Sequence, residues 1–129
     1  MTRKIEHGAV WLADLNPRQG TEAGKTRPVL IIQNQALLDA DHPSILVIPL
    51  TTRLIEDAAP LRLRLNGRDR LERDFDLLVD QIRAIDNRRL VTGPLTLLSA
   101  EEMSRIYPAI LEVMGIDLDR QVVFSVHES

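Results

Sequence analysis

Cysteine is absent from this chain of 129 residues, and histidine and aromatic residues are scarce. Without thiols, the chain can form neither a disulfide framework nor a thiolate metal site. His7, His42 and His127 lie far apart along the sequence, without the spacing typical of zinc ligands. We therefore expect no bound metal and no other cofactor, and we expect a protein of the cytoplasm.

Long hydrophobic runs are absent as well. The apolar stretches, such as Pro28–Ile32 and Ile45–Leu50, are only as long as a strand, so no membrane-spanning segment is predicted. The N-terminal residues are basic but lead into no hydrophobic segment, which argues against a secretory signal. The length suits one domain, to which we assign residues 1–129.

Lysine is the scarce cation, since it occurs only as Lys4 and Lys25 and the other basic residues are all arginine. The planar guanidinium of arginine suits phosphate, although the composition by itself favours an ordinary solvated surface. The formal net charge of −3 argues against indiscriminate nucleic-acid binding. Residues 100–129 carry −4 of this charge, which leaves +1 on residues 1–99.

Most of the chain before Ser99 is predicted to form strands. The strand-like segments are Gly8–Leu15, Val29–Ile32, Ile45–Leu50, Leu61–Leu65, Phe75–Ile85 and Asn87–Val91. Asn34 is a suitable N-cap for a short helix. Leucines alternate with Arg62 and Arg64, so these two arginines are expected to face solvent. Asn66-Gly67 predicts a turn, and Arg68 to Asp74 a loop.

The C-terminal part changes to helical periodicity. Ser99 and Glu102 form the S-x-x-E pattern of a capping box, and Gly115 is placed to end the helix. Pro108 is expected to kink it. The residues expected to form one apolar stripe are Met103, Ile106, Tyr107, Ile110, Val113 and Met114.

Several short strands before one amphipathic helix do not suit a parallel βαβ fold. We therefore predict a mostly β, α+β domain: a small twisted β-barrel with a short connecting helix and a C-terminal amphipathic helix. After the helix, residues 116–129 form an extension with a strand-like run, Gln121–Val126. This extension could add an edge strand, brace a dimer or remain loose.

Several segments, taken in order, resemble the MazF/PemK (Kid) toxin family. They are Gly8–Leu15, Asn16-Pro17, Gly20–Glu22, Thr26–Ile31, Pro49–Thr52, Asp80–Arg83, Ile85-Asp86 and the capped helix from Ser99. The resemblance covers about residues 7–115. It implies an SH3-like β-barrel of the CcdB/PemK type that forms a homodimer. It also implies the toxin of a type II toxin–antitoxin system, a ribosome-independent and metal-independent endoribonuclease that leaves 2′,3′-cyclic phosphate and 5′-hydroxyl ends on single-stranded RNA.

The resemblance also indicates site residues. In similar toxins an arginine at the start of the second strand and a threonine or serine at the end of the third carry much of the chemistry, which implies catalytic roles for Arg27 and Thr51. Glu22 matches the family's loop glutamate and would either act as general base or orient Arg27. The residues implied to contact RNA are Lys25, Thr26, Thr52, Arg53, Asp80, Gln81 and Arg83.

Asp80 and Gln81 are expected on a strand that faces RNA, where carboxylates and amides suit the Watson–Crick edges of splayed bases. Asp80 also matches an aspartate proposed as base in the Kid branch. However, Leu78 and Thr21 stand where that branch has an arginine and a histidine. The sequence therefore resembles the MazF branch more closely.

Two partners follow from the resemblance besides RNA: a second copy of the chain, and a MazE-like antitoxin whose flexible acidic segment would cover the groove. Two alternatives remain. A CcdB-like poison of DNA gyrase would have the same fold, but such proteins typically act through a tryptophan-containing C-terminus, whereas this chain ends in Phe124–Ser129. A toxin homologue that binds an antitoxin without cutting RNA is the other.

Overall fold

The computed structural model describes residues 3–16, 20 and 25–118. Within these residues, seven strands and two α-helices follow one another, with two single 3₁₀ turns between strands. They are β1 (Ala9–Asp14), β2 (Thr26–Ile31), α1 (Gln35–Asp39), β3 (Ser44–Thr51), β4 (Arg62–Leu65), β5 (Phe75–Leu78), η1 (Val79–Gln81), β6 (Arg83–Asp86), η2 (Asn87–Arg89), β7 (Leu90–Leu97) and α2 (Ala100–Met114).

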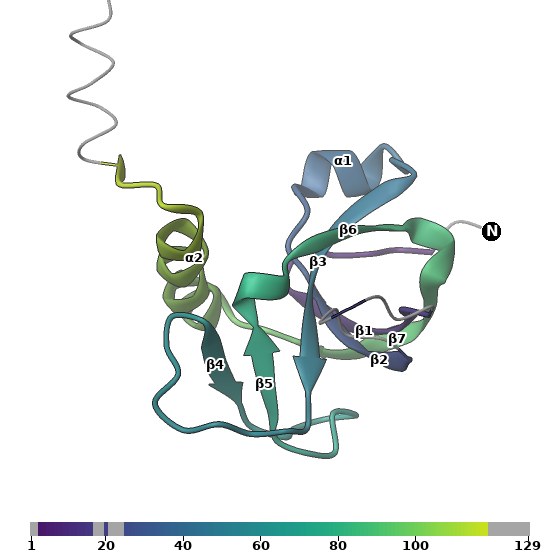
Figure 1. Ribbon diagram of the computed structural model, residues 1–129. Coiled ribbons are helices and arrows are strands. Elements are labelled where there is room, and N and C mark those ends of the chain that lie inside the picture. Colours follow the sequence, from purple (N-terminus) through teal and green to yellow (C-terminus); the bar gives the residue numbers. More distant parts are fainter. Residues whose placement is uncertain (1–2, 17–19, 21–24, 119–129) are drawn as a thin grey trace, which may run out of the picture.

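The strands form one antiparallel sheet in the order β4-β5-β3-β2-β1-β7, with β6 also paired to β3 (Figure 1). The predicted α+β class is confirmed. The expected barrel is not closed, because β4 and β7 each pair with a single strand of the described chain. The long strand β3 is the reason for this shape: it pairs with β6 from Ser44 to Val47 and with β5 at Leu50 and Thr51. The sheet thus divides along β3 instead of closing into a ring.

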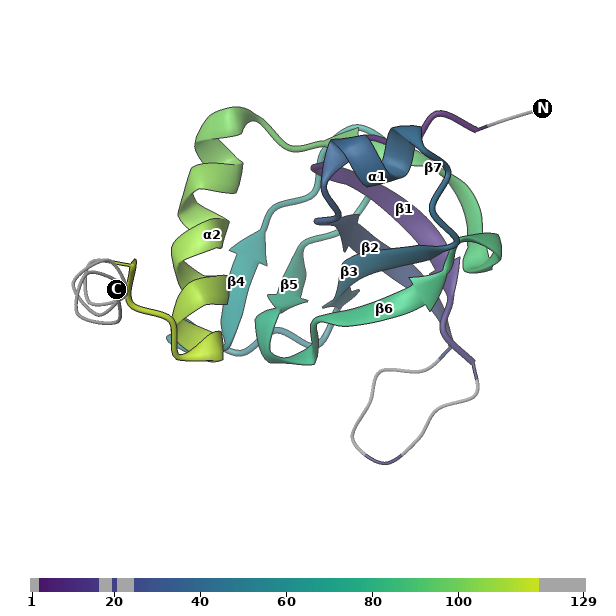
Figure 2. The same ribbon diagram turned by 90° about the horizontal axis from the view of Figure 1, so that it is seen from above.

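Both faces of the central sheet are buried, which explains why β1, β2 and β3 read as nearly continuous apolar runs. Cross-strand partners such as Val10 and Leu30 belong to one core cluster, whereas their neighbours Trp11 and Val29 belong to a second cluster. This division follows from the alternation of side chains along a strand. Helix α2 covers the first cluster, and the two helices stand over different parts of the sheet (Figure 2).

Helix α2 begins and ends where its sequence predicts. The Ser99 side chain accepts a hydrogen bond from the Glu102 backbone, the Glu102 side chain accepts one from the Ser99 backbone, and Gly115 ends the helix with a φ of 74°. The buried apolar stripe is shifted around the helix from the predicted one. Tyr107 and Met114 are exposed because they lie at the edge of the arc, which instead extends to Ala109 on its other side.

The short helix α1 also follows its predicted cap, since the Asn34 side chain accepts a hydrogen bond from the Ala36 backbone. The turn expected at Asn66-Gly67 lies further along the chain, where Arg68 and Leu71 exchange two backbone hydrogen bonds. The strand-like run Gln121–Val126 lies outside the described residues. No helix in the described chain is long and apolar enough to cross a membrane.

The prediction of one strand from Phe75 to Ile85 is wrong. The chain forms β5, turns through η1 and continues as β6, so that it pairs first with the end of β3 and then with its beginning. The buried Val79 lies in the turn, and its apolar character is what made the segment look continuous. Strand β7, in contrast, continues through Gly93-Pro94, and its register against β1 shifts between Thr96 and Thr92. Its position at the sheet edge permits the proline.

Candidate active-site pocket

Arg27 and Thr51 lie on neighbouring strands at the same end of the sheet. Strands β2 and β3 are antiparallel, with Val29 opposite Pro49. Continuing this register by two residues places Arg27, near the start of β2, opposite Thr51, the last residue of β3. Two residues far apart in the sequence therefore meet because of the pairing of the strands that carry them.

These two residues line a pocket of about 410 Å³. Three basic side chains, three hydroxyl groups and three apolar side chains surround it: Lys25, Arg27, Arg73, Thr26, Thr51, Thr52, Pro28, Leu50 and Phe75. No carboxylate belongs to this described lining. The pocket thus combines guanidinium and ammonium groups with hydroxyl donors, a chemistry suited to a phosphate group.

Hydrogen bonds fix the orientation of both central residues. The half-buried Arg27 donates from Nη1 to the backbone oxygen of Leu50 at 3.3 Å. The hydroxyl oxygen of Thr51 accepts a hydrogen bond from the backbone nitrogen of Arg53 at 3.2 Å. Because a hydroxyl group has one hydrogen and two lone pairs, Thr51 keeps its own hydrogen for a ligand in the pocket.

Arg73 enters the pocket from the loop between β4 and β5, and sequence reasoning missed it. A Cβ on Gly67 would lie 3.0 Å from the carbonyl carbon and oxygen of Arg73, so the glycine lets the two parts of the loop approach closely. The Asp74 side chain accepts a hydrogen bond from the Gly67 backbone at 2.8 Å, which closes the loop. Among the described residues, Arg73 has no hydrogen-bond or ion-pair partner.

Comparison with known proteins identifies the family. Residues 6–114 match the family described as "PemK-like, MazF-like toxin of type II toxin-antitoxin system". The chain belongs to this toxin family. The match covers both strands of the pocket, the Arg73 loop and helix α2.

Solved structures of the family have the same fold. MazF from Deinococcus radiodurans is 19% identical, with a TM-score of 0.73 over 88% of this chain and 99% of that chain. The Mycobacterium tuberculosis toxin MazF-mt6 is also 19% identical, with a TM-score of 0.69 over 84% and 98%. An endoribonuclease in complex with its cognate antitoxin, from Mycobacterial species, is 20% identical, with a TM-score of 0.64 over 88% and 96%.

Five of the residues that the family resemblance suggested meet around the pocket: Lys25, Thr26, Arg27, Thr51 and Thr52. Arg53 follows directly but lies outside the lining, and Glu22 lies outside the described residues.

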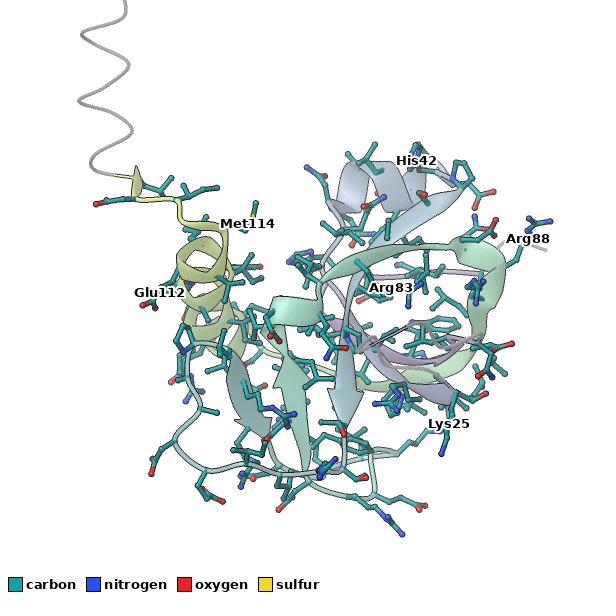
Figure 3. All side chains as sticks on the ribbon, viewed as in Figure 1. Lys25, His42, Arg83, Arg88, Glu112 and Met114 are labelled. Carbon is teal, nitrogen blue, oxygen red and sulfur yellow. The ribbon has the colours of Figure 1, made fainter. Side chains whose placement is uncertain are left out.

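The other residues suggested to contact RNA lie elsewhere on the toxin fold. Asp80 and Gln81 were expected on a strand but belong to the turn η1, where Asp80 is exposed. Arg83 lies on β6 opposite Val47, four residues before Thr51 along β3, or about 13 Å at the usual rise of a strand. Figure 3 shows Arg83 on β6 well separated from Lys25 beside β2. None of these three residues lines the pocket.

Arg64 is exposed, as the alternation of leucine and arginine predicts, and Arg62 is half-buried. Both contact Asp76, a carboxylate only 1% exposed on the neighbouring strand β5: Arg64 Nε lies 2.7 Å from Oδ1, and Arg62 Nη1 lies 3.5 Å from Oδ2. Burial raises the pKa of the Asp76 carboxyl, but hydrogen bonds from Arg64 and the Ile55 backbone outweigh it, so the pKa lies below its ordinary value. Alternation predicted the face of these arginines but not an acid on the next strand.

The described part of the chain also contains no cluster of three or more histidine, aspartate or glutamate side chains arranged to hold a metal ion.

Proposed function

We propose that this chain is the toxin endoribonuclease of a type II toxin–antitoxin system and that it cleaves single-stranded RNA in the pocket between β2 and β3. The observation that carries the proposal is the meeting of Arg27 and Thr51 in a pocket rich in cations and hydroxyl groups. Its contents match what RNA cleavage requires, because charge develops on the phosphate oxygens in the transition state. Two structurally similar proteins from Mycobacterial species are described as endoribonucleases, which agrees with this proposal.

The proposed reaction is attack of the ribose 2′ oxygen on the adjacent phosphorus. The 2′-hydroxyl loses its proton as the new P–O bond forms, and the bond to the 5′ oxygen breaks as that oxygen gains a proton. The products are a 2′,3′-cyclic phosphate and a 5′-hydroxyl end. The nucleophile and the leaving group both belong to the RNA, so the protein has to bind the phosphate, stabilise its charge and move protons.

Arg27 would bind the phosphate through its guanidinium, whose orientation the Leu50 carbonyl helps to fix. Thr51 would donate its hydroxyl hydrogen to a non-bridging oxygen. Lys25, Thr26, Thr52 and Arg73 would hold neighbouring phosphates. Glu22 would accept the 2′-hydroxyl proton or orient Arg27.

RNA that extends beyond the pocket would reach residues on other parts of the surface. Arg53 would contact its backbone, as would Arg83 on β6. Asp80 and Gln81, which belong to the turn η1, would contact bases there and not on a strand surface.

We further propose that the toxin acts in the cytoplasm as a homodimer and is inhibited by a MazE-like antitoxin with an acidic segment. Charge supports the second partner, because the cationic pocket would attract such a segment as well as RNA. The relatives solved with an antitoxin, from Mycobacterial species and from Deinococcus radiodurans, agree with it. Light scattering of the purified protein tests the dimer directly.

The decisive experiment incubates the purified protein with a long single-stranded RNA and maps both the cut sites and the end groups. We expect discrete cuts with 2′,3′-cyclic phosphate and 5′-hydroxyl ends, and we expect Arg27→Ala to abolish them without loss of folding, since Arg27 lies at a strand end outside the core clusters. Arg88→Ala is the matched control, because Arg88 is an exposed arginine outside the pocket. Full activity of a folded Arg27→Ala variant would refute the site.

The same assay in EDTA tests whether the reaction needs a metal. The proposed chemistry uses only guanidinium, ammonium, hydroxyl and carboxylate groups, so we expect equal rates with and without the chelator. Loss of cleavage in EDTA that magnesium restores would contradict the metal-independent mechanism.

A further inference from the structure

A buried carboxylate lies beneath the loop that follows Thr51. In the strand register, Asp76 of β5 stands between Thr51 of β3 and Arg64 of β4. Figure 1 shows the three strands β3, β5 and β4 side by side. Oδ2 of Asp76 accepts a hydrogen bond from the backbone nitrogen of Ile55 at 2.9 Å. Its other oxygen binds Arg64, so the carboxylate joins the sheet to the loop.

Arg62 holds the same loop at a second point. Its Nη1 donates to the backbone oxygen of Arg53 at 2.8 Å, while the Arg53 nitrogen donates to the Thr51 hydroxyl. The backbone from Arg53 to Ile55 is thus fixed by three hydrogen bonds, one from each of three strands: Thr51 on β3, Arg62 on β4 and Asp76 on β5. We use the term strap for these three residues together with the loop backbone that they bind.

The strap determines whether the Thr51 hydroxyl group is held as a hydrogen-bond donor toward the pocket. While Arg53 N–H occupies one lone pair of the oxygen, the hydroxyl hydrogen points elsewhere and is available to a ligand. If the loop shifted, the hydroxyl would lose this partner and could rotate among its staggered positions. Neither Arg62 nor Asp76 lines the pocket, and Arg62 is linked to it through its hydrogen bond to the loop backbone at Arg53.

We propose that Arg62 and Asp76 are positioning residues for RNA cleavage: they fix the backbone of residues 53–55 and thereby hold the Thr51 hydroxyl as a donor toward the scissile phosphate. This inference rests on the proposed function. It assigns a use to an ion cluster with a buried acid, whose acid and arginines lie on strands outside the β2–β3 pair.

The first test measures kcat and KM for RNA cleavage by Arg62→Ala, Thr51→Ala and the double variant. We expect Arg62→Ala to lower kcat about tenfold with KM unchanged, because a small misplacement of a catalytic group is costly. Arg62→Lys, which keeps a donor for the Arg53 oxygen, should recover part of the loss. In the Thr51→Ala background, Arg62→Ala should cause no further loss, since the two residues act as one unit.

A different pattern would overturn the proposal. If Arg62 contacted RNA directly, its replacement would raise KM and the two losses would multiply. Arg88→Ala, which also removes an arginine paired with an aspartate, serves as control and should leave both constants unchanged.

Amide hydrogen exchange tests the strap without any activity. In a normally folded Arg62→Ala variant, the Arg53 and Ile55 amides should exchange at least tenfold faster, while the Leu30 amide in the buried sheet stays protected. Unchanged exchange at both loop amides overturns the strap. The two tests are separable: absence of cleavage by the wild-type protein would refute the proposed function, whereas the exchange rates report on the strap in either case.

Discussion

Replacing Arg73 by alanine should weaken the binding of single-stranded RNA in a way that depends on salt. Arg73 is one of three basic residues in the described lining of the pocket, with Lys25 and Arg27. Each cation that neutralises a phosphate of a single strand contributes about 0.7 to the slope of log K against log salt concentration. The three together therefore contribute about 2, and Arg73→Ala should lower the slope by about 0.7.

This difference is large enough to measure. Between 50 and 200 mM salt, a slope change of about 0.7 corresponds to a factor of about 2.6 in the relative affinity of the two proteins. Fluorescence anisotropy with a 2′-O-methyl RNA is a suitable assay, because this RNA lacks the 2′-hydroxyl nucleophile and stays intact. The loss should be similar for RNAs of different sequence, since a phosphate contact carries no base information.

Arg70→Ala is the matched control for this experiment. Arg70 belongs to the same loop and is also exposed, but its side chain donates to the Pro94 carbonyl at 3.4 Å and does not line the pocket. We expect it to leave the slope unchanged. An equal decrease in slope for Arg70→Ala, or an unchanged slope for Arg73→Ala, would show that the pocket does not place Arg73 on a phosphate.

Two further predictions concern stability. A Cβ on Gly93 would lie 2.5 Å from Cδ2 of the buried Trp11, so Gly93→Ala should lower stability by about 1–3 kcal/mol and Tm by roughly 4–10 °C in calorimetry, whereas Val91→Ala on the exposed face should change little. The hydrogen bond from Arg68 lowers the pKa of Glu102 to about 2, so this pair stabilises the fold above pH about 4.5 and the contribution disappears as pH falls toward about 2. Glu102→Gln should therefore be less stable than the wild type by about 1 kcal/mol at pH 7 in urea denaturation, and the difference should vanish near pH 2.

The parts of the fold that the sequence predicted are those set by local interactions. The capping box of α2 and the Asn34 cap of α1 each involve residues within three positions of one another, so their sequence patterns were sufficient. The segment Phe75–Ile85 failed for the opposite reason. Its division into β5 and β6 depends on which part of β3 each piece joins, and nothing within the segment records that pairing.

The residues of the site also divide into those that could be predicted from the sequence and those that could not. The positions of Arg27 and Thr51 followed from the resemblance to a family whose strand order is known. Arg73 has no such signal, because it enters the pocket only through the loop that joins β4 to β5 and through the pairing of β5 with β3. Asp76 was missed likewise, since its burial between Arg62 and Arg64 depends on the register of β4 against β5.

The distribution of paired charges explains how an acidic chain could bind a polyanion. Four arginines of the described chain are paired with four carboxylates: Arg62 and Arg64 with Asp76, Arg64 also with Glu56, Arg68 with Glu102 and Arg88 with Asp86. These pairs cancel over short distances and leave little field. The described lining of the pocket, in contrast, holds three cations and no carboxylate, although the net charge of the chain is −3. Because the attraction is confined to a few contacts, RNA binding should depend on the cations of the pocket and not on the total charge of the chain.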